Sequence, residues 1–288
     1  MNNEITTKVA IVTGSSSGIG LETATHLAKN GFKTYATMRN PDKAPNILKE
    51  SQKNNLPIEV IRLDVTDDAS VHDAIQEVIT KEGRIDLLVN NAGYALFGAA
   101  EDLGIDEVKK QFDTNFYGII RTIKEVLPTM RKQKSGSIVN ISSAIGFGGM
   151  PLMSAYASTK FAMEGFTESL KAEVAPFGIN AVLVEPGVIK TDVINASPTA
   201  KKALEPTSAY SGLMQKLGEV MTSLYANCSP PSVVAEVVLK AATADNPQTR
   251  YQAGPDSEMM FSERRQKTDE EYEKFLQGFL SPPVAEVK

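Results

Sequence analysis

The stretch from Ser154 to Phe166 places a phenol and an ammonium group four residues apart, at Tyr156 and Lys160. The alanines around them favour a helix, and residues i and i+4 lie on one helix face, so the two side chains are predicted to be neighbours. A nearby ammonium favours the phenolate and would lower the pKa of the tyrosine toward the working range of a general acid/base. The same spacing also occurs on ordinary helices, so other motifs in the chain are needed to show whether Tyr156 and Lys160 are catalytic.

A glycine-rich loop near the N-terminus is the second candidate for chemistry. The sequence TGSSSGIG, at 13–20, follows a β-branched run and leads directly into a helical pattern. Glycines at 14, 18 and 20 allow a tight turn and a close approach to a pyrophosphate, whose charge a helix N-terminus stabilises. The missing Gly-Lys-Ser/Thr ending argues against a nucleoside-triphosphate loop, and the glycine spacing departs from the usual dinucleotide fingerprint. A serine-rich turn without a ligand is the alternative.

Composition narrows the class of protein. The chain has 288 residues, 42% of them hydrophobic, which is enough for a substantial core, and its net charge of −5 argues against nucleic acid or an anionic membrane as the main partner. The single Cys228 cannot form an internal disulfide, and His26 and His72 are too scattered for a zinc site, so no metal is predicted. With a polar N-terminus and no apolar run approaching about 20 residues, the sequence predicts a cytoplasmic protein without a membrane span.

Short β-branched runs alternate with longer helical patterns along the whole chain. This alternation predicts an α/β fold, with a doubly wound, seven-stranded parallel sheet covered by helices on both faces, in a single domain over 1–288. The predicted strands are 8–14, 32–38, 58–64, 85–93, 136–142, 180–187 and 249–254, and the predicted helices are 18–29, 44–53, 67–81, 105–132, 156–175 and 232–244.

Two segments break this alternation. At 192–231 the strand spacing lapses, and Leu213, Leu217, Met221 and Leu224 fall on one helical stripe, which predicts a lid over a substrate. The charged segment 255–288 is predicted to be a C-terminal extension with a surface helix and a frayed end. The part before them, 8–191, is the predicted cofactor-binding and catalytic core.

The motifs TGSSSGIG, NNAG (at 90–93) and YASTK, in this order and at these distances, resemble the short-chain dehydrogenase/reductase superfamily in its compact single-domain branch. The resemblance covers about 8–254. It implies a Rossmann-type sheet of seven strands, a nicotinamide cofactor, and hydride transfer to or from a carbonyl or alcohol carbon.

The resemblance also implies a catalytic set. Ser143 stands thirteen residues before Tyr156, where the family keeps a catalytic serine, with Ser142 as the neighbouring competitor. Asn115 matches a helix asparagine thought to hold a water in the proton relay. In the reduction direction Tyr156 would protonate the developing oxyanion while Ser143 hydrogen-bonds it, and Lys160 would hold the nicotinamide ribose and lower the pKa of Tyr156.

Cofactor contacts follow from the same resemblance. Asp64 matches the acid near the adenine, although it could be only a strand-end cap, and PGVIKT (at 186–191) matches the segment around the nicotinamide, although it could be a plain turn. The full predicted set is Gly14, Ser16, Ser17, Gly18, Ile19, Gly20, Arg39, Asp64, Val65, Asn91, Ala92, Gly93, Tyr156, Lys160, Pro186, Gly187, Val188 and Thr191.

The end of the second strand predicts the cofactor type. Relatives that prefer NAD usually carry an acidic residue there, and here Met38 takes its place and Arg39 follows. An arginine suits the 2′-phosphate of NADP, so NADP(H) is predicted. The glycine loop carries no basic residue, so Arg39 would act alone, and a solvated arginine is the alternative.

Substrate and partners are less defined. The phrases YATMRN and VEPG look like the branch of retinol and 17β-hydroxysteroid dehydrogenases, which implies an apolar alcohol or ketone, while small aldehydes or ketones stay open. A non-catalytic NADP-binding regulatory protein and an epimerase or dehydratase are rival hypotheses, which the presence of Tyr156 and Lys160 and of Arg39 argues against. Relatives pair their two long helices, so a homodimer or homotetramer through 105–132 and 156–175 is expected, with Phe161 and Phe166 at the interface or in the core.

Overall fold

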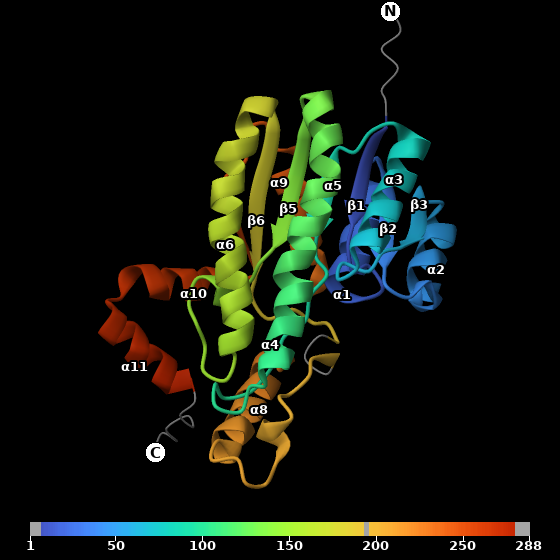
Figure 1. Ribbon diagram of the computed structural model, residues 1–288. Helices are drawn as coiled ribbons and strands as arrows, with labels where there is room; N and C mark the ends of the chain where they lie inside the picture. The colour runs from blue at the N-terminus through green and yellow to red at the C-terminus, as the bar shows by residue number, and fades with distance from the viewer. Residues whose placement is uncertain (1–6, 193–195, 280–288) are drawn as a thin grey trace, which may run out of the picture.

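A seven-stranded parallel sheet forms the centre of the computed structural model, which describes residues 7–192 and 196–279 (Figure 1). The strand order is β3-β2-β1-β4-β5-β6-β7, so the direction of winding reverses between β1 and β4. Open sheets of this kind bind ligands at the carboxyl ends of the strands, at such a reversal. The predicted single-domain, seven-stranded Rossmann-type sheet is confirmed. Its strands are β1 (Lys8–Val12), β2 (Phe32–Met38), β3 (Ile58–Arg62), β4 (Leu87–Asn90), β5 (Gly136–Ile141), β6 (Ile179–Pro186) and β7 (Arg250–Ala253).

Helices cover both faces of the sheet, and each strand sends alternate side chains to each face. In β1, Val9 and Ile11 pack on one face while Ala10 and Val12 pack on the other. The second face is covered by α1 (Gly18–Lys29), α2 (Pro45–Asn54) and α9 (Pro231–Thr243), and the first by α3 (Asp68–Glu82), α5 (Gly118–Gln133) and α6 (Ser154–Val174). Burial on both sides explains why the strands are near-continuous apolar runs.

The region predicted as one helix over 105–132 is divided in the structure. It consists of α4 (Ile105–Phe112), a π-turn (η2, Asp113–Tyr117) and α5. A π-turn inserts one residue into the helical ladder and is common at functional sites. Here it carries the predicted site residue Asn115. The sequence pattern shows only helical periodicity and does not reveal the extra residue.

A strap and a helix lie beyond the carboxyl ends of the strands. The strap, at 196–210, bonds to the loop after β4: Phe97 N donates to the Pro198 carbonyl at 3.1 Å and Ala200 N to the Phe97 carbonyl at 2.7 Å. It leads into α8 (Ser211–Ala226), which lies below the sheet in Figure 1. Short 3-10 turns lie between these elements: η1 (Pro41–Lys43), η3 (Ala144–Gly146), η4 (Ala175–Phe177) and η5 (Lys202–Leu204).

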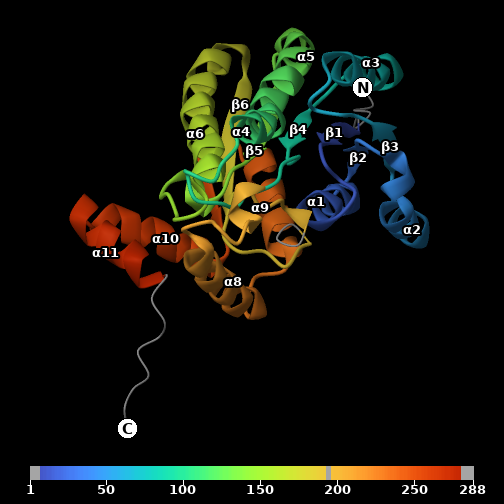
Figure 2. The same cartoon turned by 60° about the horizontal axis from the view of Figure 1, so that its bottom comes forward.

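The C-terminal segment forms two helices, α10 (Pro255–Gln266) and α11 (Asp269–Phe279), beside α8 and the loop after β5 (Figure 2). It is more than the surface helix that its charge pattern predicts, because Phe261 stacks on Phe147 with ring centroids 4.5 Å apart and Met260 is buried. The predicted frayed end, at 281–288, lies outside the described residues. Among the helices that are described, none has the length and apolarity needed to cross a membrane.

Candidate active site

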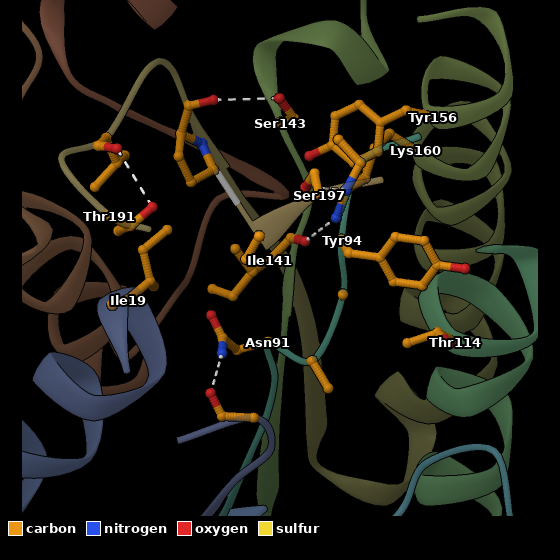
Figure 3. Close-up of a pocket in the computed structure, with 18 of the residues that line it drawn as sticks. Ile19, Asn91, Tyr94, Thr114, Ile141, Ser143, Tyr156, Lys160, Thr191 and Ser197 are labelled. Atoms are coloured by element: carbon orange, nitrogen blue, oxygen red, sulfur yellow. Dashed lines mark hydrogen bonds between the residues drawn. The ribbon is translucent and has the colours of Figure 1, made fainter. Parts of the chain in front are cut away.

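One cavity of about 920 Å³ lies at the carboxyl ends of the strands and brings together most of the predicted site residues (Figure 3). Two predicted residues, Gly20 and Asn115, do not line it. Those that do are Gly14, Ser16, Ser17, Gly18, Ile19, Arg39, Asp64, Val65, Asn91, Ala92, Gly93, Ser143, Tyr156, Lys160, Pro186, Gly187, Val188 and Thr191. Residues spread over most of the chain therefore converge on a single site.

The glycine loop is held closely against the segment after β4. Gly14 has a φ of +68°, and a Cβ there would lie 2.9 Å from the Cα of Ala92. A Cβ on Gly20 would lie 2.3 Å from the Gly14 carbonyl oxygen, and Asn91 Nδ2 donates to that carbonyl at 3.1 Å. Gly20 thus shapes the loop from behind, while the backbone at Gly14 and the start of α1 face the cavity. Free amides at a helix start suit a phosphate group.

Tyr156 and Ser143 place two hydroxyl groups in the same part of the cavity. Tyr156 lies in the first turn of α6, and Ser143 lies two residues after the end of β5. Both side chains line the cavity, and the Ser143 hydroxyl lies near enough to the phenol to lower its pKa. The Ser143 hydroxyl also lies 3.5 Å from the Pro186 carbonyl, and its oxygen accepts from Ile145 N at 3.3 Å. A carbonyl oxygen placed between the two hydroxyls would receive two hydrogen bonds.

The pKa of Tyr156 is raised to about 12, which is opposite to the lowering predicted from the Tyr-Lys spacing. Although one side of Tyr156 opens to the cavity, burial of the phenol disfavours its charged form, and the nearby Ser143 hydroxyl opposes this only in part. Lys160 Nζ lies 5.6 Å from the centre of the Tyr156 ring and donates to the Ile141 carbonyl at 2.7 Å. The ammonium group lies close to the phenol, but the effect of burial on the pKa of Tyr156 is larger than the effect of this charge.

Lys160 is itself enclosed, with 6% of its surface exposed. Burial lowers its pKa to about 8, and the carboxylate of Glu164 opposes this shift. The side chain therefore stays mostly protonated at neutral pH and titrates slightly above it. Such a group can donate a hydrogen bond to a hydroxyl and stabilise the negative charge that forms when a proton leaves Tyr156.

Asn115 lies in the π-turn and is fully buried behind the cavity wall. Its Nδ2 donates to the Tyr94 carbonyl at 2.8 Å and to Thr159 Oγ1 at 3.3 Å, and its Oδ1 accepts from Tyr94 N at 3.1 Å. The side chain thus ties the loop after β4 to α6. In this arrangement its polar atoms contact protein groups and do not open on the cavity.

The end of the cavity near β2 and β3 carries a group of charged side chains. Asp64 lines it and also accepts hydrogen bonds from the amide and hydroxyl of Thr66, so the carboxylate closes the turn after β3 as well. Arg39 lines it, and so does Lys43, which the sequence reasoning missed. Asn40 caps the short turn η1 and brings Lys43 back toward the end of β2; the sequence NPDK could have indicated this turn. Arg39 therefore does not stand alone.

The other end of the cavity is lined by apolar side chains that the sequence reasoning mostly missed. Five methionines come from three separate segments: the loop after η3, α8 and α10. Of the predicted stripe on α8, two residues line the cavity, whereas Leu217 is buried in a cluster with Phe97 and Met153. The apolar lining consists of Ala95, Phe97, Ile145, Met150, Met153, Met221, Leu224, Met259 and Met260.

A winding reversal beneath a glycine loop, with a serine, tyrosine and lysine in one cavity, defines a class of nicotinamide-dependent oxidoreductases. A family model described as short chain dehydrogenase matches residues 8–202. The chain belongs to this family, whose members are oxidoreductases that act on CH–OH or C=O groups with NAD(P)(H).

Individual relatives agree with this assignment. The chain is 34% identical to a 3-ketodihydrosphingosine reductase of Bacteroides thetaiotaomicron, covering 90% of this chain and 92% of the relative. It is 35% identical to human 17-beta-hydroxysteroid dehydrogenase type 1, covering 84% and 76%. The crystal structure of a short-chain dehydrogenase from Streptomyces avermitilis superposes with a TM-score of 0.80 at 31% identity, covering 94% of this chain and 98% of that one. The resemblance predicted from the sequence is confirmed.

Proposed function

We propose that this protein is an NADP(H)-dependent reductase of a bulky apolar ketone or aldehyde, with Tyr156 as the general acid. The observation that carries the proposal is that Tyr156 and Ser143 line the same part of one cavity with the glycine loop. Lys160 lies behind the pair with its ammonium group near the phenol.

The side chains have distinct roles in the proposed reduction. The nicotinamide, when bound, supplies a hydride to the carbonyl carbon. As the carbonyl oxygen gains the electron pair of the C=O π bond, Tyr156 gives it a proton and Ser143 donates a hydrogen bond to it. The Lys160 ammonium stabilises the phenolate left behind. Because the pKa of Tyr156 is about 12, the phenol is fully protonated at neutral pH, which favours the reduction direction there.

NADP(H) is favoured over NAD(H) by the charges at the end of β2. Arg39 and Lys43 both line the cavity there, and Met38 stands where an acidic residue would repel a 2′-phosphate. Two cations in place of one carboxylate support a preference for the phosphorylated cofactor.

An apolar substrate is supported by the methionine-lined end of the cavity. Methionine side chains are flexible and adapt to irregular apolar ligands. Apart from the proposed catalytic Lys160, the lysine and arginine residues that line the cavity are Arg39 after β2, Lys43 in η1 and Lys110 in α4, and none of them comes from α8 or α10. The relatives named for a hydroxysteroid and for 3-ketodihydrosphingosine agree with a large apolar group next to the carbonyl.

The segment 192–231 is proposed to act as the lid over this substrate. Met221 and Leu224 of α8 reach the cavity, and Ser197 and Pro198 of the strap line it as well. Of this segment, 193–195 lie outside the described residues.

The protein is further proposed to be a cytoplasmic homodimer or homotetramer that pairs α4–α5 and α6. Ile105, Tyr117 and Phe161 are exposed apolar side chains on these elements, whereas Phe166 packs edge-on against Phe116 and belongs to the core. Light scattering of the purified protein should give a mass of two or four chains, and a monomer at working concentration would contradict the proposal.

Cofactor oxidation against a graded carbonyl panel tests the function. NADPH and NADH are each offered with small aldehydes, keto esters, retinal, long-chain 3-ketones and steroid ketones. The proposal expects turnover with NADPH that is highest for a large apolar carbonyl. Turnover confined to small aldehydes would reject the apolar substrate, and tight NADPH binding without any turnover would instead support a regulatory protein.

A further inference from the structure

Two buried carboxyl groups lie behind Lys160, outside the cavity. Glu164 stands one helical turn after Lys160 on α6 and is 5% exposed, and Glu185 stands near the end of β6 and is 0% exposed. Figure 1 shows α6 lying alongside β6. Buried acidic side chains are costly unless they are paired, so this pair calls for an explanation.

The donors around the two carboxyl groups are few. Arg250 Nε donates to Glu164 Oε2 at 3.0 Å and lies 3.2 Å from Glu185 Oε1, while its NH1 pairs with the more exposed Glu168 at 2.7 Å. Gln252 Nε2 donates to Glu185 Oε2 at 2.8 Å. One arginine thus faces three acidic side chains, and only one buried negative charge can be balanced by it.

The two carboxyl groups lie close together, because Arg250 Nε is 3.0 Å from Glu164 Oε2 and 3.2 Å from Glu185 Oε1. Glu164 Oε1 and Glu185 Oε1 are both buried, and neither has a hydrogen-bond partner among the described residues. A proton placed between the two groups would give them a hydrogen bond, which two ionised carboxylates cannot form because they only accept. Burial raises the pKa of both groups, and that of Glu185 reaches about 8, so Glu185 is the partner that keeps the proton.

Glu164, one member of the pair, is packed directly against Lys160. A Cβ built on Gly146 would lie 3.2 Å from Lys160 Cβ, 3.3 Å from Glu164 Cγ and 2.8 Å from Ser142 Oγ, so these three side chains converge at one point. The charge of Glu164 raises the pKa of Lys160 against the effect of burial. Around the pair, the titratable and charged groups are Lys160, Glu168 and Arg250.

We propose that Glu164 and Glu185 share one proton and act as a positioning pair for Lys160. Glu185 donates to Glu164, and the single negative charge that stays on Glu164, held by Arg250, keeps the neighbouring Lys160 side chain in its ammonium form. The consequence for catalysis rests on the proposed function of Lys160, whereas the shared proton does not.

Infrared spectroscopy of the full chain tests the shared proton without any turnover. A protonated-carboxyl stretching band should be present in the wild-type protein at pH 7 and disappear as the pH rises through about 8. Glu185→Gln should remove the band and keep a donor to Glu164, while the control Glu168→Gln, one turn further along α6, should keep it. Absence of the band in the wild-type protein at pH 7, or its persistence in Glu185→Gln, would overturn the pair.

The pH dependence of kcat/KM tests the effect on Lys160. Glu164→Gln removes the charge that raises the pKa of Lys160, so the alkaline limb should move to lower pH by about one unit. Glu185→Gln and Glu168→Gln should leave this limb in place. An equal shift in Glu164→Gln and Glu168→Gln would show a structural effect only and overturn the positioning role. If no carbonyl is turned over, the proposed function fails, and the infrared band still shows whether Glu164 and Glu185 share a proton.

Discussion

The two ends of the cavity are built in different ways. The cofactor end is made mostly of backbone: the loop from Gly14 to Gly20 is pressed against the segment after β4, and its conformation is fixed by Asn91. The substrate end is made of side chains, chiefly methionines, on a loop, on α8 and on α10. A site made of backbone admits few substitutions, whereas a wall of flexible side chains can be replaced without disturbing the sheet. Cofactor binding and substrate choice should therefore respond separately to mutation.

Tyr156 lies at the boundary of the two ends, and Tyr156→Phe should give the largest loss of kcat/KM. Loss of the proton donor should lower kcat/KM by about a hundredfold to ten thousandfold, with NADPH affinity little changed. Tyr94→Phe is the matched control, because Tyr94 also lines the cavity. Stopped-flow kinetics and a cofactor titration measure both quantities. Equal losses in the two variants would remove Tyr156 from the reaction.

Gly14→Ala tests the backbone-built end. The residue has φ +68°, and the added Cβ would lie 2.9 Å from the Cα of Ala92, so the variant should lose stability and NADPH affinity together. Gly31→Ala is the control, since Gly31 has φ +87° with nothing within 4 Å of the added Cβ. Backbone strain alone should cost about 1–2 kcal/mol, and Gly14→Ala about 1–3 kcal/mol more. Urea unfolding measures the difference; equal losses would argue against a tightly packed loop.

Arg39→Asp should change the cofactor preference and leave substrate choice intact. Reversing the charge at the end of β2 removes a partner of the 2′-phosphate and repels it. The ratio of kcat/KM for NADPH over NADH should fall by about tenfold to a hundredfold. Lys29→Asp, at the exposed end of α1, carries the same charge change and should leave the ratio unchanged. A preference that survives Arg39→Asp would refute the assignment.

Met221→Gln tests the side-chain-built end and should have the smallest effect. Placing an amide in the apolar wall should raise KM for a large apolar ketone by about tenfold and spare small aldehydes. Met214→Gln is the control, because Met214 lies on the same helix in the neighbouring apolar cluster but does not line the cavity. Steady-state kinetics with the large ketone and with a small aldehyde measures the two KM values in each variant. A parallel rise of KM for both substrates would mean that Met221 acts through the fold.

The sheet and the cofactor end could be predicted because their signals are local in the sequence. β-branched runs mark the strands, and the glycine loop and the Tyr156–Lys160 spacing each occupy a few consecutive residues. Lys43, Met150 and Met260 could not be assigned to the site in this way, because only the packing of η1, η3 and α10 brings them to the cavity.

The raised pKa of Tyr156 could not be predicted from residue spacing either. A neighbour four residues away on a helix is visible in the sequence, but the burial that outweighs it comes from segments far along the chain. The same holds for Glu164 and Glu185, which are twenty-one residues apart in the sequence and meet only when α6 packs on β6.

Transfer of deuterium from NADPH labelled at the nicotinamide C4 position would show hydride transfer to a carbonyl carbon. The preferred ketone should be converted to an alcohol carrying one deuterium on the carbinol carbon, as mass spectrometry and NMR of the product would record. Tyr156→Phe should slow this transfer without changing where the label goes. Binding of NADPH with no label transferred to any carbonyl of the panel would contradict the assignment as a reductase.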